Sequence, residues 1–390
     1  MSLNQLLLPV VYLLTLVMFC WLGKRIPRLN RVITNQIDPV VLSRQSPIDG
    51  LRGILATSVF AYHFYITYGF ANTGKWISPT IPLLNNMGAV PVSLFFMITG
   101  YLFFNKFKQA QTDWIKLYLG RAKRIYPLYL SLAILCAVIF IGQNGVAIDW
   151  AGLLLWLGKW LGFNVPPLPH FYAKPLIAGA VWTLIYEWAF YSILPLLAFL
   201  LHRQPKLTVK YSLFVLATTA VAIYLFMHSI PQLHLLFILA MIPVYFAPRF
   251  KALQQRFTPL MHGLVPLLAL GIMIYTKPYS LTQMLCITLL FSVIASGYDF
   301  FNALQNKVLI FLGEISYSIY LMHGLVIYLA LLVVPSFNFA WPMGVYYVYL
   351  PLVFLLTVIL SIVTHNYIEK PFYQSKNKRQ NHLQSPQKSV

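Results

Sequence analysis

Two apolar segments of this sequence each contain an ionisable side chain suited to acid–base chemistry. His63 follows Arg52 by eleven residues in the segment 50–70, and Glu187 lies inside the segment 178–200. With a rise of about 1.5 Å per residue, His63 would lie about 16 Å beyond Arg52, and Glu187 roughly 13 Å inside its own segment. Histidine is the usual general base, and a carboxylate can fix its tautomer and support its charged form. We therefore predict that His63 and Glu187 are catalytic and meet near the middle of a membrane.

Each of these groups also has a structural interpretation. His63 could be hydrogen-bonded to a neighbouring helix, and Glu187 could be a protonated or paired packing residue. Asp49 could be a helix N-cap, and Arg52 and Arg124 could be anchors whose charged ends reach toward the membrane surface. Residue type and spacing alone leave both interpretations open.

A later segment, GEISYSIYLMHG, is richer in polar groups than a lipid-facing helix should be. Ser316, Tyr320 and His323 are spaced i, i+4 and i+7, so they share one helix face, and Tyr317 is next to it. These side chains could line a cavity, or they could pack a helix bundle through their hydroxyl groups. Glu369 in YIEKPFY could pair with an arginine of an earlier segment or face water.

The elements that position these residues must be membrane helices. The 390 residues are 59% hydrophobic and only 9% charged, with a mean hydropathy of +0.72, far from the composition of soluble domains. The predicted fold class is therefore all-α: a polytopic helix bundle of about eleven spans. We place the spans near residues 5–22, 50–70, 88–104, 126–143, 178–200, 209–226, 234–247, 261–276, 282–297, 308–331 and 346–367.

The distribution of basic residues predicts the orientation of the chain. With the N-terminus outside, the inside segments hold 24 of the 28 lysines and arginines and the outside segments hold 4. The C-terminus would then be cytoplasmic. The apolar stretch 151–163 is too short to span, so we expect a re-entrant or interfacial helix there.

Several other classes of protein are disfavoured. The basic residues, although they give a net charge of +20, form no single patch, so no nucleic-acid partner is expected. Cys20, Cys136 and Cys286 form no CxxC pair, and no metal site is expected. GxSxG, P-loop, GxGxxG and HExxH motifs do not occur.

The sequence resembles the membrane acyltransferase 3 family, the O-acetylases of lipopolysaccharide, peptidoglycan and exopolysaccharide. The resemblance rests on six blocks in the family's order: IDGLRG followed by His63, SLFFMITGYLFF, RAKRIYPLY, VWTLIYEWAFY, LGEISYSIYLMHG and YIEKPF. It implies a ten-helix acyltransferase core at 48–372, preceded by an extra N-terminal span and cytoplasmic linker at 1–47. The polar composition of residues 373–390 separately predicts a disordered cytoplasmic tail. Thr99 stands where the family commonly has serine, but it keeps the hydroxyl.

The resemblance also implies roles for individual residues. The family's pattern of an arginine, ten residues and a histidine falls on Arg52 and His63, which makes that pair essential. Its basic block falls on Arg121 and Arg124, and its tryptophan-to-glutamate block ends on Glu187. No cofactor is expected to be bound permanently; acetyl-CoA or another acyl-CoA would be the donor substrate, with its phosphates on the three arginines, because guanidinium forks bind phosphate in a bidentate manner.

In this interpretation His63 is the general base on an acceptor hydroxyl, or else a transient acyl carrier, and Glu187 orients it. Ser316 and Tyr317 would line the acceptor path. The acceptor would be a carbohydrate or glycolipid of the envelope, reached from the inner membrane, and a separate protein could deliver it. The alternative function is a proton-coupled transporter or lipid-linked glycan flippase, which would also need buried histidine and glutamate.

Overall fold

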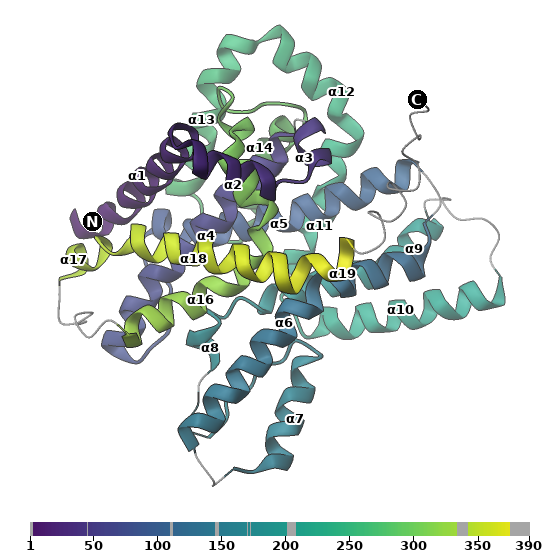
Figure 1. Cartoon of the computed structure of the whole chain (residues 1–390). Helices are drawn as coiled ribbons and strands as arrows, with labels where there is room; N and C mark the ends of the chain where they lie inside the picture. The colour runs from purple at the N-terminus through teal and green to yellow at the C-terminus, as the bar shows by residue number, and fades with distance from the viewer. Residues whose placement is uncertain are drawn as a thin grey trace, which may run out of the picture.

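The computed structural model describes residues 3–44, 46–109, 112–144, 148–169, 171, 173–200, 208–333 and 342–374. These residues form a helical protein, in which one isolated β-bridge joins Leu168 and Phe171 (Figure 1). The α-helices are α1 (Leu3–Arg25), α2 (Pro27–Gln36), α3 (Pro39–Arg44), α4 (Pro47–Thr73), α5 (Pro82–Gln109), α6 (Trp114–Asn144), α7 (Trp150–Trp160), α8 (Ala173–Leu176), α9 (Trp182–Leu200), α10 (Val209–Met227), α11 (Leu235–Leu239), α12 (Met241–Arg256), α13 (Thr258–Tyr275), α14 (Leu281–Ala295), α15 (Lys307–Glu314), α16 (Ser316–Val333), α17 (Met343–Tyr347), α18 (Leu350–Thr364) and α19 (Lys370–Gln374). Shorter turns are η1 (Pro231–His234), η2 (Ala303–Gln305) and the π-helical η3 (His365–Glu369).

The described part of the chain contains eight helical stretches that are long and apolar enough to cross a membrane, or nine if the bent pair α15 and α16 is one span. Helices α10 and α13 are the least covered by the rest of the protein, and they expose large apolar side chains such as Leu213, Leu216, Leu264 and Leu267. Such apolar surfaces suit lipid rather than water. The protein is therefore a multi-pass membrane protein with a helix-bundle fold.

Each of the eleven predicted segments contains helix, but their bounds, continuity and lengths differ from the prediction. Two of these segments are neither among the eight long apolar stretches nor part of the bent pair. Helix α14 has only 15 residues, and α4 has 27 residues but contains the polar groups of the predicted site. Helix α9 begins at Trp182 rather than at residue 178, because the backbone of Ala178 and Gly179 has positive φ angles of 48° and 62°. A left-handed residue ends a helix, so α8 and α9 are separate.

The segment 308–331 was predicted as one span and is in fact broken. Helices α15 and α16 meet at an angle of 74°, with Ile315 between them. Helix α15 is held against α4 by a close glycine contact: a Cβ built on Gly313 would lie 1.9 Å from the carbonyl oxygen of Asp49. The same holds for Gly53, whose Cβ would lie 2.3 Å from the carbonyl oxygen of Leu309. Small residues let helix backbones approach this closely, and the bend then directs α16 away from α15.

Helix α4 lies at the centre of the described part of the chain and packs against α5, α15 and α16. Asp49 lies in its first turn rather than at the N-cap, which is Ser46. Because α4 carries both Arg52 and His63, its position fixes the two ends of the predicted site. The glycine contacts therefore serve to place those two side chains.

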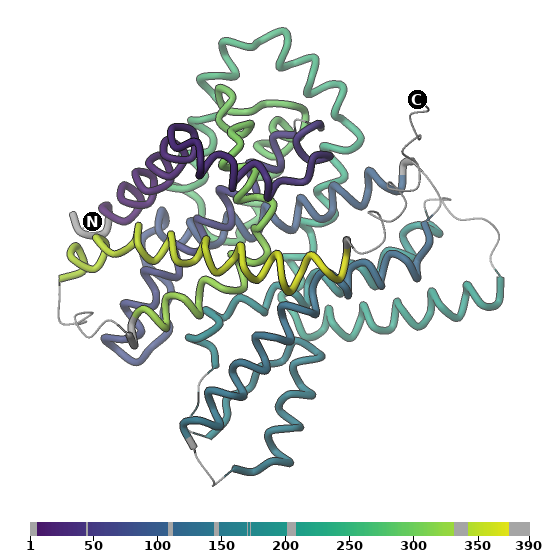
Figure 2. The backbone as a smooth tube through the Cα atoms, viewed as in Figure 1, coloured from purple at the N-terminus to yellow at the C-terminus, as the bar shows by residue number. Residues whose placement is uncertain are grey.

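The first and last helical parts of the chain lie side by side, although they are far apart in the sequence (Figure 2). Helix α1 packs against α17 and α18. It also contacts α4, where the hydroxyl groups of Tyr12 and Thr57 are 3.0 Å apart. Helix α7, which forms most of the predicted re-entrant segment 151–163, packs beside α6 and projects with it from the rest of the ribbon (Figure 1). Beyond Gln374, the predicted tail lies outside the described residues.

Candidate functional site

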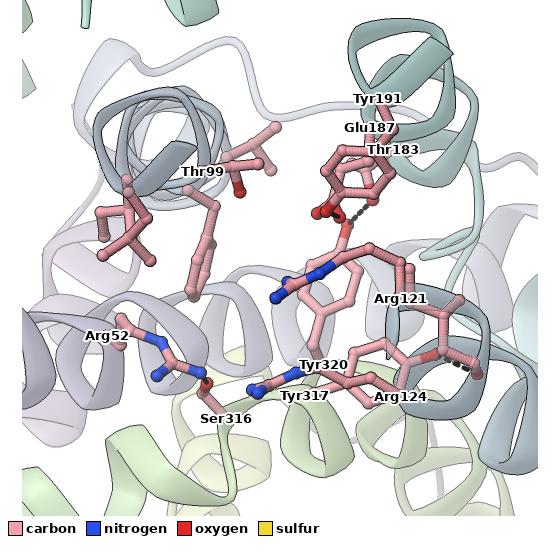
Figure 3. A pocket seen from close by; sticks show the side chains of 15 residues that line it. Arg52, Thr99, Arg121, Arg124, Thr183, Glu187, Tyr191, Ser316, Tyr317 and Tyr320 are labelled. Carbon is pink, nitrogen blue, oxygen red and sulfur yellow. Dashed lines mark hydrogen bonds between the residues drawn. The ribbon is translucent and has the colours of Figure 1, made fainter. Parts of the chain in front are cut away.

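An arginine-rich cavity of about 260 Å³ lies between α4, α5, α6, α9 and α16. We call it the arginine cavity. Arg52 of α4 extends into it from one side, and Arg121 and Arg124 of α6 extend into it from the other (Figure 3). Its other polar lining residues are Thr99, Thr183, Glu187, Tyr191, Ser316, Tyr317 and Tyr320. One carboxyl group thus faces three guanidinium groups, so the cavity is suited to an anionic ligand.

Contacts with neighbouring side chains hold the arginines in place. Arg52 Nη2 donates a hydrogen bond to Ser316 Oγ at 3.0 Å, at the bend between α15 and α16. The guanidinium of Arg121 lies over the ring of Phe103, 5.2 Å from its centroid, and that of Arg124 lies 6.0 Å from the ring centroid of Tyr373. Stacking of this kind orients the planar guanidinium and leaves its N–H edge for a ligand.

The carboxyl group of Glu187 is bound within the same cavity. Tyr191, one turn along α9, donates a hydrogen bond to Glu187 Oε2 at 2.6 Å. The opposite wall includes Tyr317, whose hydroxyl donates to the carbonyl oxygen of Ile125 at 2.7 Å. Ser316 and Tyr317 therefore lie where the predicted cavity-lining face of α16 begins, beside the arginines.

A second cavity of about 260 Å³, which we call the histidine cavity, contains His63. Its aromatic lining residues are Tyr62, Trp76, Trp182, Tyr279 and Tyr320. Ser78, Asn85 and Lys174 add polar groups, and Ala178 and Gly179 bring the backbone close. Burial raises the pKa of Tyr279, which lies in the loop before α14, so its hydroxyl stays protonated and can donate a hydrogen bond.

His63 is paired with a second histidine. His63 Nδ1 and His323 Nε2 are 2.9 Å apart, and the two rings are stacked with their centroids 4.9 Å apart. His323 is fully buried, and its Nδ1 is 3.0 Å from the carbonyl oxygen of Ile319. This contact fixes the positions of the protons.

A carbonyl oxygen can only accept, so Nδ1 of His323 carries a hydrogen. In neutral His323, Nε2 is then an acceptor, and Nδ1 of His63 must donate to it. The remaining nitrogen of His63, Nε2, is left with its lone pair. The arrangement thus prepares His63 to accept a proton through Nε2.

The cavities reach toward opposite ends of the protein. Ser78, Lys174 and Tyr279 of the histidine cavity belong to connecting segments predicted to lie outside, with Lys174 in the short helix α8. A third cavity of about 560 Å³ adjoins the arginine cavity, because both are lined by Thr99, Leu102 and Arg121. It also includes the side chains of Lys106 and Lys116, next to a loop predicted to be cytoplasmic.

Comparison with known proteins gives the family. The family model for the acyltransferase domain matches residues 46–366, most of the chain. The chain belongs to the membrane acyltransferase 3 family. Among curated members, the O-acetyltransferase OatA of Staphylococcus aureus is 24% identical over 365 residues, covering 83% of this chain and 56% of OatA. The acyltransferase MdmB of Streptomyces mycarofaciens is 27% identical over 184 residues, covering 43% of this chain and 42% of MdmB.

The chain therefore spans a little over half the length of the OatA proteins that it matches. No solved structure matches it significantly. The arrangement of the site residues in this chain therefore rests on the structure described above. All seven predicted site residues line one of two neighbouring cavities: His63 the histidine cavity, and the other six the arginine cavity.

The predicted contact between His63 and Glu187 is wrong. The two residues line different cavities, with His63 bonded to His323 and Glu187 to Tyr191. Similar depth in two helices does not make their side chains meet, because helix rotation decides which faces oppose each other. The spacing places His323 on the polar face of α16, and the structure shows that it is the partner of His63.

Glu369 also differs from both predicted environments. It is buried, 2% exposed, rather than facing water. Its carboxyl group accepts a hydrogen bond from Ser318 and lies 3.5 Å from His365 Nδ1. The π-helical turn η3 turns the carboxyl group toward α16, and so it ties α16 to the last helical part of the chain instead of pairing with an arginine.

Proposed function

We propose that the protein is an O-acyltransferase that moves an acyl group, acetyl above all, from acyl-CoA to a hydroxyl group of an envelope polysaccharide or glycolipid. Membership of the acyltransferase family supports it, and so does the similarity to the OatA proteins, which are named as O-acetyltransferases. The observation that carries the proposal is the pair of adjoining cavities. One presents three arginines, and the other presents a histidine whose proton positions suit a base.

The donor would enter from the arginine side. The pyrophosphate of acyl-CoA suits the forked guanidinium groups of Arg52, Arg121 and Arg124, which can each form two parallel hydrogen bonds. Lys106 and Lys116 of the adjoining cavity add positive charge for the nucleotide end of the donor. The acyl thioester would then extend toward His63.

The acceptor would enter the histidine cavity, so Ser316 and Tyr317, which line the arginine cavity, would contact the donor instead of lining the acceptor path as predicted. Nε2 of His63 takes the proton of the acceptor hydroxyl while the hydroxyl oxygen bonds to the thioester carbonyl carbon. The carbon–sulfur bond then breaks, and the CoA sulfur leaves with the proton held by His63. The ester is formed and His63 returns to its neutral state. His323 is a positioning residue here, because it touches His63 rather than the reacting atoms.

Glu187 has a different proposed role from the one predicted. It lies among the arginines, where its carboxyl group reduces their mutual repulsion while the donor is absent. Its bond to Tyr191 keeps it at the wall, clear of the centre of the cavity. Glu187 would thus organise donor binding instead of orienting His63.

We place the protein in the inner membrane, with the N-terminus outside and the C-terminus in the cytoplasm. The distribution of basic residues supports this orientation. So does the position of the cavities, since the arginine side would meet cytoplasmic acyl-CoA and the histidine side would meet envelope glycans. Only the acyl group would need to cross.

The proposal is tested with the purified protein in lipid nanodiscs, isotopically labelled acetyl-CoA and envelope polysaccharide from cells that lack the gene, de-esterified with mild alkali. Mass spectrometry should show polysaccharide carrying labelled acetyl esters and an equal amount of free CoA. Label that stays in acetyl-CoA, or a product that forms equally well without the protein, would contradict the proposal. The first of these results is what a transporter or flippase would give.

A further inference from the structure

The arginine cavity and the histidine cavity meet at two side chains. Val92 of α5 and Tyr320 of α16 are the described residues that line both. We call this pair the neck. Any group that is bound by the arginines and reacts at His63 has to extend past these two side chains.

The neck is held firmly on the Tyr320 side. The hydroxyl groups of Tyr320 and Thr183 are 3.2 Å apart and form a hydrogen bond. The ring of Tyr320 meets that of Phe95 edge to face, with the centroids 6.4 Å apart. Helices α9 and α5 thus fix this ring between them.

On the Val92 side of the neck, a hydrogen bond from α4 to the backbone of α5 fixes the position of α5. Pro91 lies inside α5, and having no N–H it cannot bond to the carbonyl oxygen of Met87 one turn earlier. Ser58 of α4 supplies the missing donor, with its Oγ 2.8 Å from that oxygen. Val92 itself is buried, and its position is therefore set by contacts between α5 and α4.

We propose that Val92 and Tyr320 determine which acyl group the protein transfers, by limiting its length and excluding charge. This inference rests on the proposed acyl transfer. The isopropyl group of Val92 and the ring of Tyr320 offer no charged partner, so a carboxylate on the acyl chain would lose its water there uncompensated. The neck selects short, uncharged acyl groups such as acetyl.

The effect of resizing the neck follows from the cost of added methylene groups. A pocket discriminates by about 10- to 200-fold for one methylene when it fits closely. Val92→Ala removes two methyl groups from the neck and should raise the relative use of a longer chain at least about fivefold. Val92→Leu adds one methylene and should lower it.

The experiment offers acetyl-CoA and butanoyl-CoA together, each with its own isotopic label, to the purified protein with the de-esterified envelope polysaccharide. The ratio of butanoyl to acetyl esters is measured for each variant. A ratio within one variant does not depend on how much of it has folded. Val90→Ala is the matched control, because Val90 is on the same helix and is 6% exposed, as is Val92, yet it lines neither cavity.

Val92→Ala should raise the ratio and Val92→Leu should lower it, while Val90→Ala leaves it as in the natural protein. An unchanged ratio in both Val92 variants, or an equal change in Val90→Ala, would overturn the role of the neck while leaving acyl transfer intact. If Val92→Ala does not fold, Val92→Leu tests the neck by itself, because it should lower the ratio of butanoyl to acetyl esters. No ester from either donor in the natural protein would overturn the proposed function and the neck together.

Discussion

Replacing His323 by phenylalanine tests the proton arrangement at His63. The change removes the acceptor that lies 2.9 Å from His63 Nδ1, and does so at a fully buried position. His63 also forms a hydrogen bond with the backbone of Val59, one turn earlier on α4, so losing His323 costs this buried donor at most about 1 to 3 kcal/mol. In the other tautomer of His63 the proton is on Nε2, so Nε2 cannot accept a proton from the acceptor hydroxyl. This inactive tautomer becomes more favourable by the same free energy.

That free energy sets the size of the expected effect. Since each 1.36 kcal/mol is tenfold in rate, the turnover of His323→Phe should fall by at most about 150-fold. His323→Gln should lose less, because its amide oxygen can still accept from His63 Nδ1. Affinity for acetyl-CoA should not change, because His323 lies outside the arginine cavity.

The double variant separates a positioning role from a merely structural one. If His323 acts through His63, adding His323→Phe to His63→Ala should slow acyl transfer no further, because the group it positions is already gone. Initial rates with labelled acetyl-CoA, together with thermal unfolding of each purified variant, measure this. Losses that multiply in the double variant would refute the reasoning, as would an unaffected rate in His323→Phe.

The other predictions concern donor binding, packing and orientation. Arg52→Lys should weaken acetyl-CoA binding about tenfold without lowering thermal stability, since lysine keeps the charge but loses the fork; equal binding in a titration would contradict this. Gly313→Ala should destabilise the protein by about 1 to 3 kcal/mol, because the added Cβ would lie 1.9 Å from a backbone oxygen of α4. Gly263→Ala should not destabilise it, because a Cβ there meets nothing within 4 Å. Equal melting temperatures of the two variants would contradict the close packing of α15 against α4. In intact cells an impermeant thiol reagent should label Lys174→Cys and spare Lys116→Cys, and the reverse pattern would contradict the orientation.

The sequence was sufficient to locate the helices and the cavity residues. Apolar runs of about twenty residues mark membrane helices directly, and a polar face at i, i+4 and i+7 predicts a lined cavity, as on α16. Arg52 and His63 lie on one helix, so the distance between them along that helix also follows from their spacing in the sequence. Local geometry of this kind is contained in the chain itself.

Relations between helices could not be predicted in the same way. Depth placed His63 and Glu187 at one level, but rotation of α9 turns Glu187 toward the arginines and Tyr191. The bend before Ser316 falls inside a segment predicted as one span, and the polar residues there indicate a cavity rather than a break; the close contact of Gly313 with α4 accounts for it. Such contacts depend on pairs of distant residues, and one sequence does not reveal them.

The most direct test of the central claim is the rate of acyl transfer by His63→Ala. The account predicts that the purified variant inserts, folds and binds acetyl-CoA like the natural protein, yet transfers acetyl groups to the polysaccharide about 10²- to 10⁴-fold more slowly. Transfer at nearly the natural rate by a folded His63→Ala would show instead that His63 is a packing residue.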